Sequence, residues 1–457
     1  MKKVFLLLAV CNLLFSNVLF AQKENYIWYF GMFAGLDFNS GAPVALTNSA
    51  MNQGEGCSSI SDGNGNLLFY TNGAGVWDRN HIQMPNGNGL NGGWSSTQSA
   101  LIVPFPVNNN LYYIFTTTQL SMALSNYSIV NMLLNGGNGD ITIKNNLLNN
   151  QSAEKLTAVK HANNNDVWVM LHGAFNNSFY AYLVTASGIS PPVISNAGPV
   201  FSGNASIGYM KFSPDGAKIA YAAQLSFYVG LFDFDAGTGN VTNEKYLSLA
   251  GLNADSYGVE FSSTGKYLFC SCLPYNKIYQ WDITSNDTAI INSTRQLIVS
   301  SASPSTFGAL QIGPDGKIYV DRNGSDYLDV INYPDSSGVL CNYVDSAISL
   351  SGKTCWFGLP NFITSYFLPT GINSNIQPQN QITISPNPAS DKITITGKAA
   401  DKTKYEITIS DITGRQCLQT PNTLLPTTIY ISRLQQGIYF VTVSDGEARV
   451  VRKVVKQ

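Results

Sequence analysis

The sequence predicts an all-β fold in which one multi-stranded unit repeats around a ring and a small β-sandwich follows it. A strand–turn–strand phrase, clearest in residues 208–221, recurs along the chain. Five copies start 50 residues apart, at Ala158, Gly208, Gly258, Gly308 and Gly358. A period near 50 residues with several strands per unit is typical of a β-propeller. Short alternating strands after residue 380 are typical of an Ig-like β-sandwich.

The phrase at residues 208–221 explains why the unit is a hairpin. Met210 and Phe212 alternate with polar or partly polar neighbours, as expected for a strand with two different faces. Pro214 presets the backbone for a tight turn and Gly216 relaxes its last position. We interpret this turn as scaffolding, and Lys211 as the informative position because the equivalent residue varies from copy to copy.

Seven copies of the phrase predict seven blades. Third strands at residues 228–235, 277–283 and 327–333, each followed by a further short strand, give about four strands per blade. The last copy has no second half, so we expect the N-terminal strands, at residues 26–46, to complete it and close the ring. A six-bladed ring is the competing interpretation. The seven copies start at Gly56, Ala100, Ala158, Gly208, Gly258, Gly308 and Gly358.

Glycine at the head of most copies has a packing explanation. Inner strands crowd the axis of a propeller, and a residue without a side chain lets backbones approach each other. The functional alternative is a ring of backbone groups around the mouth of the channel.

Composition and the first residues predict an exported protein. The chain has 457 residues and a net charge of −2, which excludes a basic field for nucleic acid. A hydrophobic content of 44% argues against disorder. Lys2 and Lys3 precede an apolar run that ends at Ala21, so residues 1–21 are expected to be a signal peptide. A membrane anchor is the alternative, and the polar residues within the run favour cleavage.

The sequence pattern changes after the predicted ring. Residues 369–380 carry two prolines and no periodicity, which predicts a linker between a propeller at 22–368 and a sandwich at 381–457. The last segment resembles the type A sorting domain of the type IX secretion system of Bacteroidetes-type bacteria. The resemblance is carried by residues 385–389 and 409–414, by Leu434 with residues 437–441, and by the basic end. Its motif positions are Pro386, Asn387, Pro388, Gly414, Gly437, Tyr439, Lys453 and Lys456.

This resemblance implies passage through the periplasm and across the outer membrane by the type IX machinery. Removal of the domain, with attachment to surface lipopolysaccharide or release, is implied as well. An ordinary Ig-like domain that binds a partner is the alternative.

The ring resembles WD-repeat-like and lactonase-like propellers through the turns at residues 213–216 and 313–316. It departs from true WD repeats because the Gly-His…Trp-Asp motif does not recur. Its first strand and the segment after Gly358 resemble those of secreted propellers in the same bacteria. The resemblance implies a fold and not a chemistry.

Candidate binding residues lie near the predicted axis and in one loop. Lys211 and Gln311 are each three residues after the glycine of their copy, and Glu260 is two after its own, so the polar ring they suggest is approximate. Such a ring binds a sugar or peptide, or lines a water-filled channel. Trp94 lies in a glycine-rich loop, where it stacks on a sugar or fills the space beneath the loop.

Catalytic and metal-binding patterns are missing from the sequence. The three histidines have no partner at metal-ligand spacing, and there is no nucleophile elbow or phosphate loop. The glycine turns that contain Asp215 and Asp315 lack the closely spaced Asp and Asn residues of a calcium-binding loop. We therefore expect no cofactor and no metal.

Six cysteines remain after the signal peptide, and Cys341 with Cys355 is the predicted disulfide. Cys270 and Cys272 share one strand face and are expected to pack as small apolar residues.

The leading functional hypothesis is a surface-attached or secreted binding propeller for a glycan, a peptide or a surface protein. The lack of a catalytic pattern favours a monomeric binding protein over an enzyme. A lactonase-like hydrolase that uses the central pore and a structural component of an adhesion or gliding layer are the alternatives.

Overall fold

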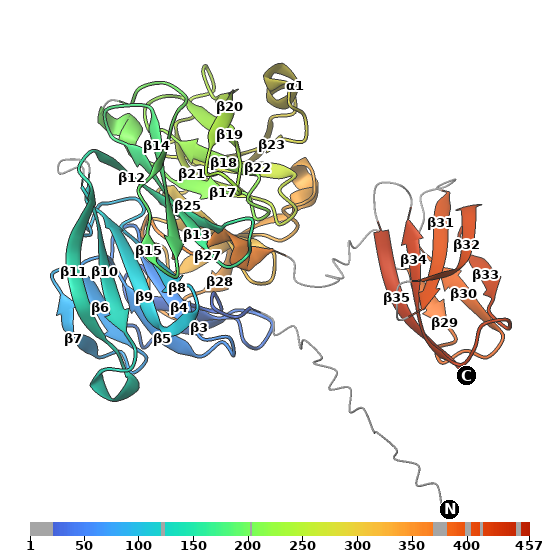
Figure 1. The fold of residues 1–457 in the computed structure, drawn as a ribbon. Coiled ribbons are helices and arrows are strands. Elements are labelled where there is room, and N and C mark those ends of the chain that lie inside the picture. Colours follow the sequence, from blue (N-terminus) through green and yellow to red (C-terminus); the bar gives the residue numbers. More distant parts are fainter. Residues whose placement is uncertain are drawn as a thin grey trace, which may run out of the picture. The chain divides into compact units, whose positions relative to one another are not determined.

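The protein folds into two compact units, divided between Leu368 and Pro369 (Figure 1). The computed structural model describes residues 22–119, 124–201, 203–368, 382–397, 404–411, 415–444 and 449–457. The predicted signal peptide and linker lie outside these residues. Within them, no helix is both long enough and apolar enough to span a bilayer.

The described part of the larger unit contains seven antiparallel sheets that follow one another along the chain. The first sheet has three strands: β1 (Ile27–Phe30), β2 (Ala34–Asp37) and β3 (Val44–Leu46). The second consists of β4 (Ser58–Ser61), β5 (Leu67–Thr71), β6 (Gly75–Asp78) and β7 (Gln83–Asn88). The third consists of β8 (Ala100–Phe105), β9 (Asn108–Thr117), β10 (Ser125–Asn131) and β11 (Asp140–Asn149).

The remaining four sheets repeat the same plan. The fourth has β12 (Ser152–Lys160), β13 (Val167–Gly173), β14 (Ser178–Thr185), β15 (Gly188–Ile189) and β16 (Val193–Asn196). The fifth has β17 (Met210–Phe212), β18 (Lys218–Ala222), β19 (Tyr228–Phe234) and β20 (Val241–Ser248). The sixth has β21 (Ser256–Phe261), β22 (Tyr267–Cys272), β23 (Lys277–Asp282) and β24 (Gln296–Ser300). The seventh has β25 (Phe307–Ile312), β26 (Ile318–Arg322), β27 (Tyr327–Ile331) and β28 (Tyr343–Ser349).

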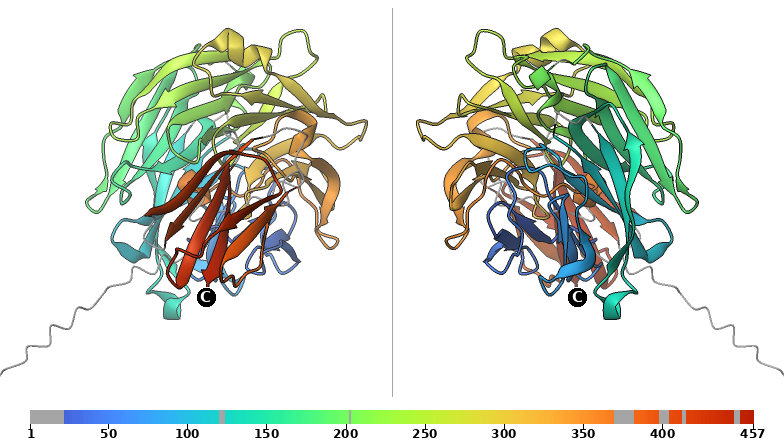
Figure 2. Two further views of the ribbon diagram at one scale, coloured as in Figure 1. Left: turned by 90° about the vertical axis from the view of Figure 1, so that its right-hand side faces the viewer. Right: turned by 90° about the vertical axis from the view of Figure 1, so that its left-hand side faces the viewer.

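The first strands of successive sheets lie side by side, and this arrangement defines a β-propeller. β4 contacts β8, β8 contacts β12, and the contacts continue through β17 and β21 to β25. Figure 2 shows the sheets following one another around a ring in chain order. Short helices occur only between strands in the described residues, including α1 (Thr288–Ser293) and the 3-10 turns at Asn135–Gly137, Gly203–Ser206, Gly338–Cys341 and Thr364–Phe367.

The repeated phrase forms the expected hairpin of β17 and β18. Met210 pairs with Tyr221 and Phe212 with Ile219. Gly216 has a φ of +70°, which a glycine adopts without strain, and its amide donates to the carbonyl of Ser213 at 2.9 Å. The turn glycine therefore fixes the register of the hairpin, in agreement with the interpretation of the turn as scaffolding.

Glycines at the heads of the first strands are needed for close packing. A Cβ on Gly258 would lie 2.7 Å from the carbonyl oxygen of Gly308. A Cβ on Gly308 would in turn lie 2.9 Å from the Cα of Phe357, and one on Gly358 would overlap the backbone of Glu55. Neighbouring sheets thus meet backbone to backbone at these positions.

The closure of the ring differs from our expectation. Residues 358–367 form no ladder with the N-terminal strands, which make a three-stranded sheet by themselves. Residues 358–367 make single parallel bridges instead, between Pro360 and Cys57 and between Ile363 and Ala158. The side-chain amide of Asn361 donates to the carbonyl of Leu156 at 2.7 Å. This segment is buried among the first strands of several sheets, so it lies near the axis rather than in one blade.

The six cysteines within the described residues are free thiols, five of them buried and Cys417 partly buried. The predicted pair of Cys341 and Cys355 therefore does not form a disulfide in the structure. The Cys355 thiol donates instead to the carbonyl of Arg322 at 3.0 Å. Cys270 and Cys272 pack in the core, as expected.

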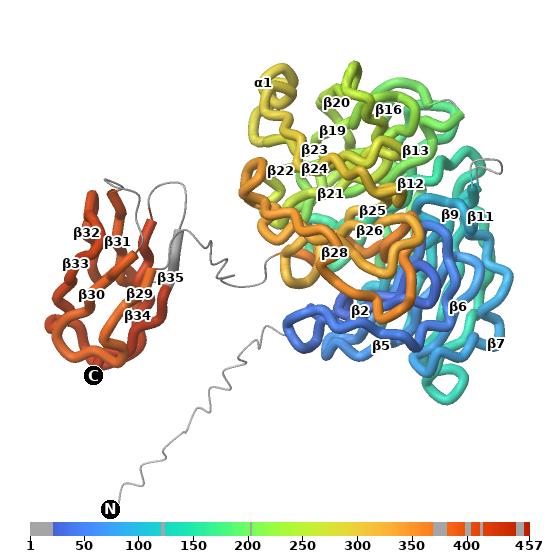
Figure 3. The backbone as a smooth tube through the Cα atoms, turned by 180° about the vertical axis from the view of Figure 1, so that it is seen from behind, coloured from blue at the N-terminus to red at the C-terminus, as the bar shows by residue number. Residues whose placement is uncertain are grey.

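The smaller unit is made of two antiparallel sheets, seen from behind in Figure 3. One has β29 (Thr383–Ser385), β30 (Lys392–Thr396) and β33 (Thr427–Tyr430). The other has β32 (Gln416–Thr423), β31 (Tyr405–Asp411), β34 (Gly437–Ser444) and β35 (Arg449–Lys456). Apolar residues from both, such as Ile393, Ile407 and Val441, form one core.

Two motif positions of this unit hold its ends together. The Asn387 side chain donates to the carbonyl of Lys453 at 2.8 Å and accepts from the amide of Val455 at 2.9 Å. Gly414 lies outside the described residues.

Candidate functional site

The three predicted axial residues come together, but they are buried. Lys211 on β17 donates to the side-chain oxygen of Gln311 on β25, and its Nζ lies 3.5 Å from Glu260 Oε2 on β21. The Glu260 carboxylate also accepts from the amide of Ile312 at 3.2 Å. Each of the three side chains is at most 3% exposed. The trio joins three neighbouring first strands inside the channel.

The apparent offset of Glu260 disappears when the copies are aligned on their turns. Lys211, Glu260 and Gln311 each lie five residues before the turn glycine, at Gly216, Gly265 and Gly316. The copy that starts at Gly258 is one residue shorter than the other two between its head glycine and its turn glycine. Counting from the turn therefore places the three residues at equivalent positions, whereas counting from the head does not.

Burial dominates the protonation of the charged pair in this trio. It lowers the pKa of Lys211 and raises that of Glu260, and their mutual attraction opposes both effects. The Lys211 ammonium also lies 5.8 Å from the centre of the Tyr209 ring. The trio connects strands inside the channel. Its ligand-binding role, which we predicted from the sequence, stays a prediction.

An open pocket lies farther along the axis, where the first strands begin. Its volume is about 350 Å³, and it is lined by Glu55, Glu154, Tyr257, Phe357, Gln119 and Gln224, among others. Glu55, Tyr257 and Phe357 each come one residue before the glycine that starts a copy of the phrase. Since those glycines crowd together, the residues before them converge on the mouth of the channel. We call this opening the axial pocket.

Two carboxyl groups dominate the electrostatics of the axial pocket. Burial, followed by repulsion from the neighbouring Glu154 carboxylate, raises the pKa of Glu55 to about 7. Ser95 Oγ and the Tyr257 hydroxyl donate to Glu55, at 3.0 and 3.2 Å, and partly oppose this rise. Glu154, only 2% exposed, accepts from the amide and hydroxyl of Thr97, both at 2.9 Å.

Aromatic residues form the floor beneath the carboxyl groups. The rings of Tyr209 and Tyr257 meet edge to face at 5.8 Å. Both hydroxyls lie near the carbonyl oxygen of Phe357, at 3.5 and 3.4 Å. The Tyr209 ring separates the axial pocket from Lys211, so the mouth and the buried trio are distinct layers along the axis.

A buried cation that interacts with Glu154, Lys155, is held by the backbone. The Lys155 ammonium is fully buried and donates to the carbonyls of Ile207, Gly208 and Ala222, at 3.0, 2.8 and 2.6 Å. Burial lowers its pKa to about 7. An ammonium has three donors, so Lys155 is saturated by backbone and connects β12 to the fifth sheet.

Trp94 stands beside the axial pocket and is 48% exposed. Its indole covers Gly54, where an added Cβ would lie 2.8 Å from Nε1. The Gln53 side chain donates to the carbonyl of Trp94 at 3.2 Å and holds the loop. The ring therefore covers backbone next to Glu55 and also presents a face to solvent.

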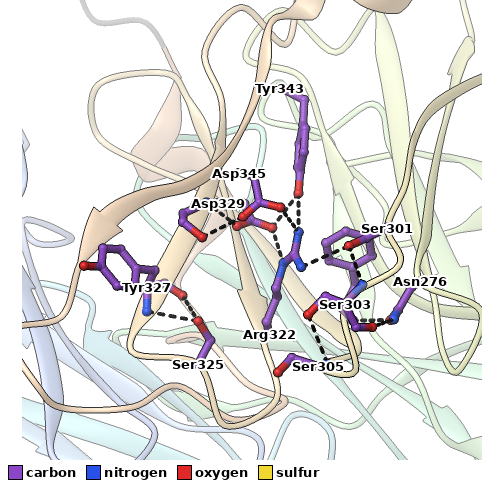
Figure 4. Close-up of polar contacts among 12 residues, drawn as sticks. Asn276, Ser301, Ser303, Ser305, Arg322, Ser325, Tyr327, Asp329, Tyr343 and Asp345 are labelled. Carbon is purple, nitrogen blue, oxygen red and sulfur yellow. Dashed lines mark hydrogen bonds and ion pairs between the residues drawn. The ribbon is translucent and has the colours of Figure 1, made fainter.

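A second charged cluster is a structural connection within the seventh sheet (Figure 4). The Arg322 guanidinium, on β26, bonds Asp329 Oδ2 at 2.6 Å, Asp345 Oδ2 at 2.7 Å and the Tyr343 hydroxyl at 2.8 Å. It also lies 4.6 Å from the centre of the Phe307 ring. These partners satisfy the guanidinium, and none of them lines the axial pocket.

Among the described residues, no three His, Cys, Asp or Glu side chains gather as a metal site requires. No histidine lines the axial pocket. His172 is buried and packs against the Phe201 ring, at 4.1 Å between ring centres.

The sequence analysis missed Glu55, Glu154 and Tyr257. A signal for two of them was present: the residue before each repeat glycine varies between Glu, Ile, Tyr and Phe. Glu154 had no such signal, because β12 begins before the repeat position at Ala158 and bulges between Ser152 and Leu156.

Solved structures with similar shapes include several propellers. A protein from Lactobacillus plantarum is 14% identical at a TM-score of 0.46, with 74% of this chain and 99% of that chain covered. The Cps50 (Swd1) β-propeller domain of Myceliophteria thermophila is 11% identical at a TM-score of 0.40, covering 65% and 94%. The periplasmic gluconolactonase of Pseudomonas aeruginosa is 11% identical at a TM-score of 0.38, covering 89% and 98%. At such TM-scores we draw no conclusion about activity from them.

Sequence comparison identifies the smaller unit. No curated protein matches the chain. Residues 383–457 match the family described as the secretion system C-terminal sorting domain. This match agrees with the motif positions around Asn387 and Gly437 and implies interaction with the type IX secretion machinery. The chain is thus a β-propeller with a type IX sorting domain at its C-terminal end, exported to the cell surface or secreted.

Proposed function

We propose that the protein is a binding protein whose axial pocket takes a ligand rich in hydroxyl or ammonium groups. The observation that carries this proposal is the pair of Glu55 and Glu154 in an open pocket of about 350 Å³. Pockets of a few hundred Å³ with a few convergent polar groups are the usual size for small-ligand sites. Carboxylates accept hydrogen bonds and disfavour anions, while Tyr257 and Phe357 offer apolar contact.

The domain assignment belongs to the same proposal. The seven sheets are the blades of a closed seven-bladed propeller over residues 22–368, and residues 381–457 are an Ig-like sandwich. Residues 1–21 are a signal peptide and residues 369–380 a linker. Sheets in chain order and the two-sheet core of the smaller unit support these assignments.

A binding screen on the full chain tests the proposed site. Immobilised wild-type protein is exposed to neutral, amino and acidic saccharides and to short peptides, and hits are titrated by calorimetry. Glu55→Gln and Glu154→Gln remove one carboxylate each while keeping the side-chain shape. Loss of a charge-assisted hydrogen bond predicts about ten-fold weaker binding or more.

Asp166→Asn is the matched control, because Asp166 lies in the turn between β12 and β13, at the other end of these strands. Equal affinity of all four proteins for every hit would show that the ligand binds elsewhere. A preference for acidic saccharides would contradict the proposed chemistry.

The same carboxyl pair favours one second candidate, a hydrolase that uses the pore. A carboxyl group with a pKa of about 7 exchanges a proton readily at neutral pH and suits a general acid. Glu154 is the neighbouring carboxylate. Turnover of chromogenic glycosides or of a simple lactone, abolished by Glu55→Gln and retained by Asp166→Asn, would establish this candidate, and turnover that survives Glu55→Gln would exclude it.

A further inference from the structure

Two further hollows border the axial pocket. A hollow of about 270 Å³ includes Trp94, Asn91 and Gln119, and Gln119 also lines the axial pocket. A larger hollow of about 570 Å³ includes Tyr228, Tyr246 and Gln224, and Gln224 also lines the axial pocket. The axial pocket therefore has a neighbouring hollow at Gln119 and another at Gln224.

Each outer hollow presents an aromatic face. Trp94 is about half exposed in the first hollow. In the second hollow the rings of Tyr228 and Tyr246 stack with centres 4.0 Å apart, and Tyr246 is 44% exposed. An exposed flat ring packs well against the apolar face of a sugar ring. The carboxyl groups and amides at the centre suit hydrogen bonds with hydroxyl groups, which recur along a chain of sugar rings.

The wall of the larger hollow is held in a strained conformation. Leu225 and Phe227 have φ values of +61° and +56°, although neither is glycine. The buried Asp255 carboxylate accepts from the amide of Leu225 at 2.7 Å and holds this loop. Leu225 remains 59% exposed. Backbone strain of this kind persists only where the surroundings enforce it, and it concentrates at binding sites.

The charged side chains of the axial pocket indicate which kind of glycan chain it would bind. Two carboxyl groups, Glu55 and Glu154, line the central space, and the neighbouring buried ammonium of Lys155 has all three donors taken by carbonyls. An anionic polymer would place its charges against this excess of carboxyl groups and would find no free donor on Lys155. We infer that the three hollows form one groove for a linear glycan of neutral or amino sugars, with aromatic contacts at both ends and hydrogen bonds at the centre. This inference rests on the proposed function of the axial pocket.

Chain length separates the groove from the pocket in an experiment. Calorimetry on the full chain uses disaccharides and hexasaccharides of glucose, mannose, xylose and N-acetylglucosamine, a glucosamine hexamer, and a galacturonate hexamer. We expect one neutral or amino hexamer to bind about ten-fold more tightly than its disaccharide, and the galacturonate hexamer to bind most weakly.

Variants of the two ends give the second arm. Trp94→Ala and Tyr246→Ala are each expected to weaken hexamer binding about ten-fold and to leave disaccharide binding unchanged, whereas Glu154→Gln weakens both. Tyr430→Ala, which removes an exposed ring of the smaller unit, is the control.

The outcomes distinguish the two proposals. Equal binding of a disaccharide and its hexamer, or a hexamer affinity that Trp94→Ala and Tyr246→Ala do not change, overturns the groove and leaves the axial pocket standing. If no saccharide binds and an oligolysine peptide binds with dependence on these rings, the glycan assignment is wrong. If no probe depends on Glu154, the axial pocket and the groove both fail.

Discussion

The protonation of Glu55 leads to a pH dependence of stability that can be calculated from the structure. The folded protein holds the pKa of this carboxyl at about 7, against an ordinary value of 4.5. Between these values the folded chain binds more protons than the unfolded chain, so the free energy of unfolding falls as the pH rises through this window. The contribution is complete below the ordinary pKa and is lost once the pH exceeds the folded pKa.

The size of this loss follows from the two pKa values. One pKa unit corresponds to about 1.4 kcal/mol, which places the full difference at about 3 kcal/mol. The Glu55 carboxyl borders an open pocket, and screening by water reduces the expected loss to about 2 kcal/mol. Glu55→Gln keeps the shape of the side chain and does not titrate.

Denaturant unfolding, followed by tryptophan fluorescence, measures this difference. We expect the wild-type protein to lose about 2 kcal/mol relative to Glu55→Gln between about pH 5 and pH 8. Titrating groups that do not interact with Glu55 are common to the two proteins and cancel, so the measured difference reports Glu55 together with its coupling to Glu154. A gap between wild type and variant that is the same at both pH values would refute the reasoning, because it would mean that Glu55 titrates alike in both states.

Four further predictions concern other parts of the chain. Arg322→Met leaves Asp329 buried without its cation and is expected to destabilise the propeller by about 3–5 kcal/mol in thermal unfolding, and an unchanged midpoint would contradict this. Gly358→Ala places a Cβ in the backbone of Glu55 and should prevent soluble expression, whereas Gly63→Ala, with open space around it, should express normally. Cys341 and Cys355 should both be alkylated in denaturant without reductant, and mass spectrometry would reveal a disulfide as protected thiols. Deletion of residues 383–457 should keep the protein inside the cell, and normal surface amounts by immunoblotting would argue against the sorting role.

The repeating scaffold was predictable because its signals are local. Pro214 and Gly216 set a turn within four residues, and short polar turns recur in the copies that start at Ala158, Gly258 and Gly308, so both the hairpins and their order follow from the sequence. The closing segment was not predictable in the same way. Residues 358–367 contact several sheets at once, and no short-range pattern specifies such contacts.

The candidate site was predictable only in part. Strand alternation placed Lys211, Glu260 and Gln311 near the axis, and the structure brings them together. Their burial could not be read from the sequence, because it depends on Tyr209 and on the closing segment above them. Part of the axial pocket comes from residues outside the regular strands, such as Glu55 and Phe357, whose positions depend on how glycines from different sheets meet.

The axial pocket draws residues from both ends of the propeller. Glu55 lies shortly before β4, near the start of the unit, and Phe357 lies shortly before its last residue. A nascent chain therefore has no site until residue 357 has been made and the closing segment has docked among the first strands. Ligand binding therefore reports whether the whole propeller has been made. A propeller truncated before this segment would contain most of its blades but would lack part of its ligand pocket. Because the sorting domain follows this segment in the chain, a protein that carries the export signal also carries every residue that its pocket requires.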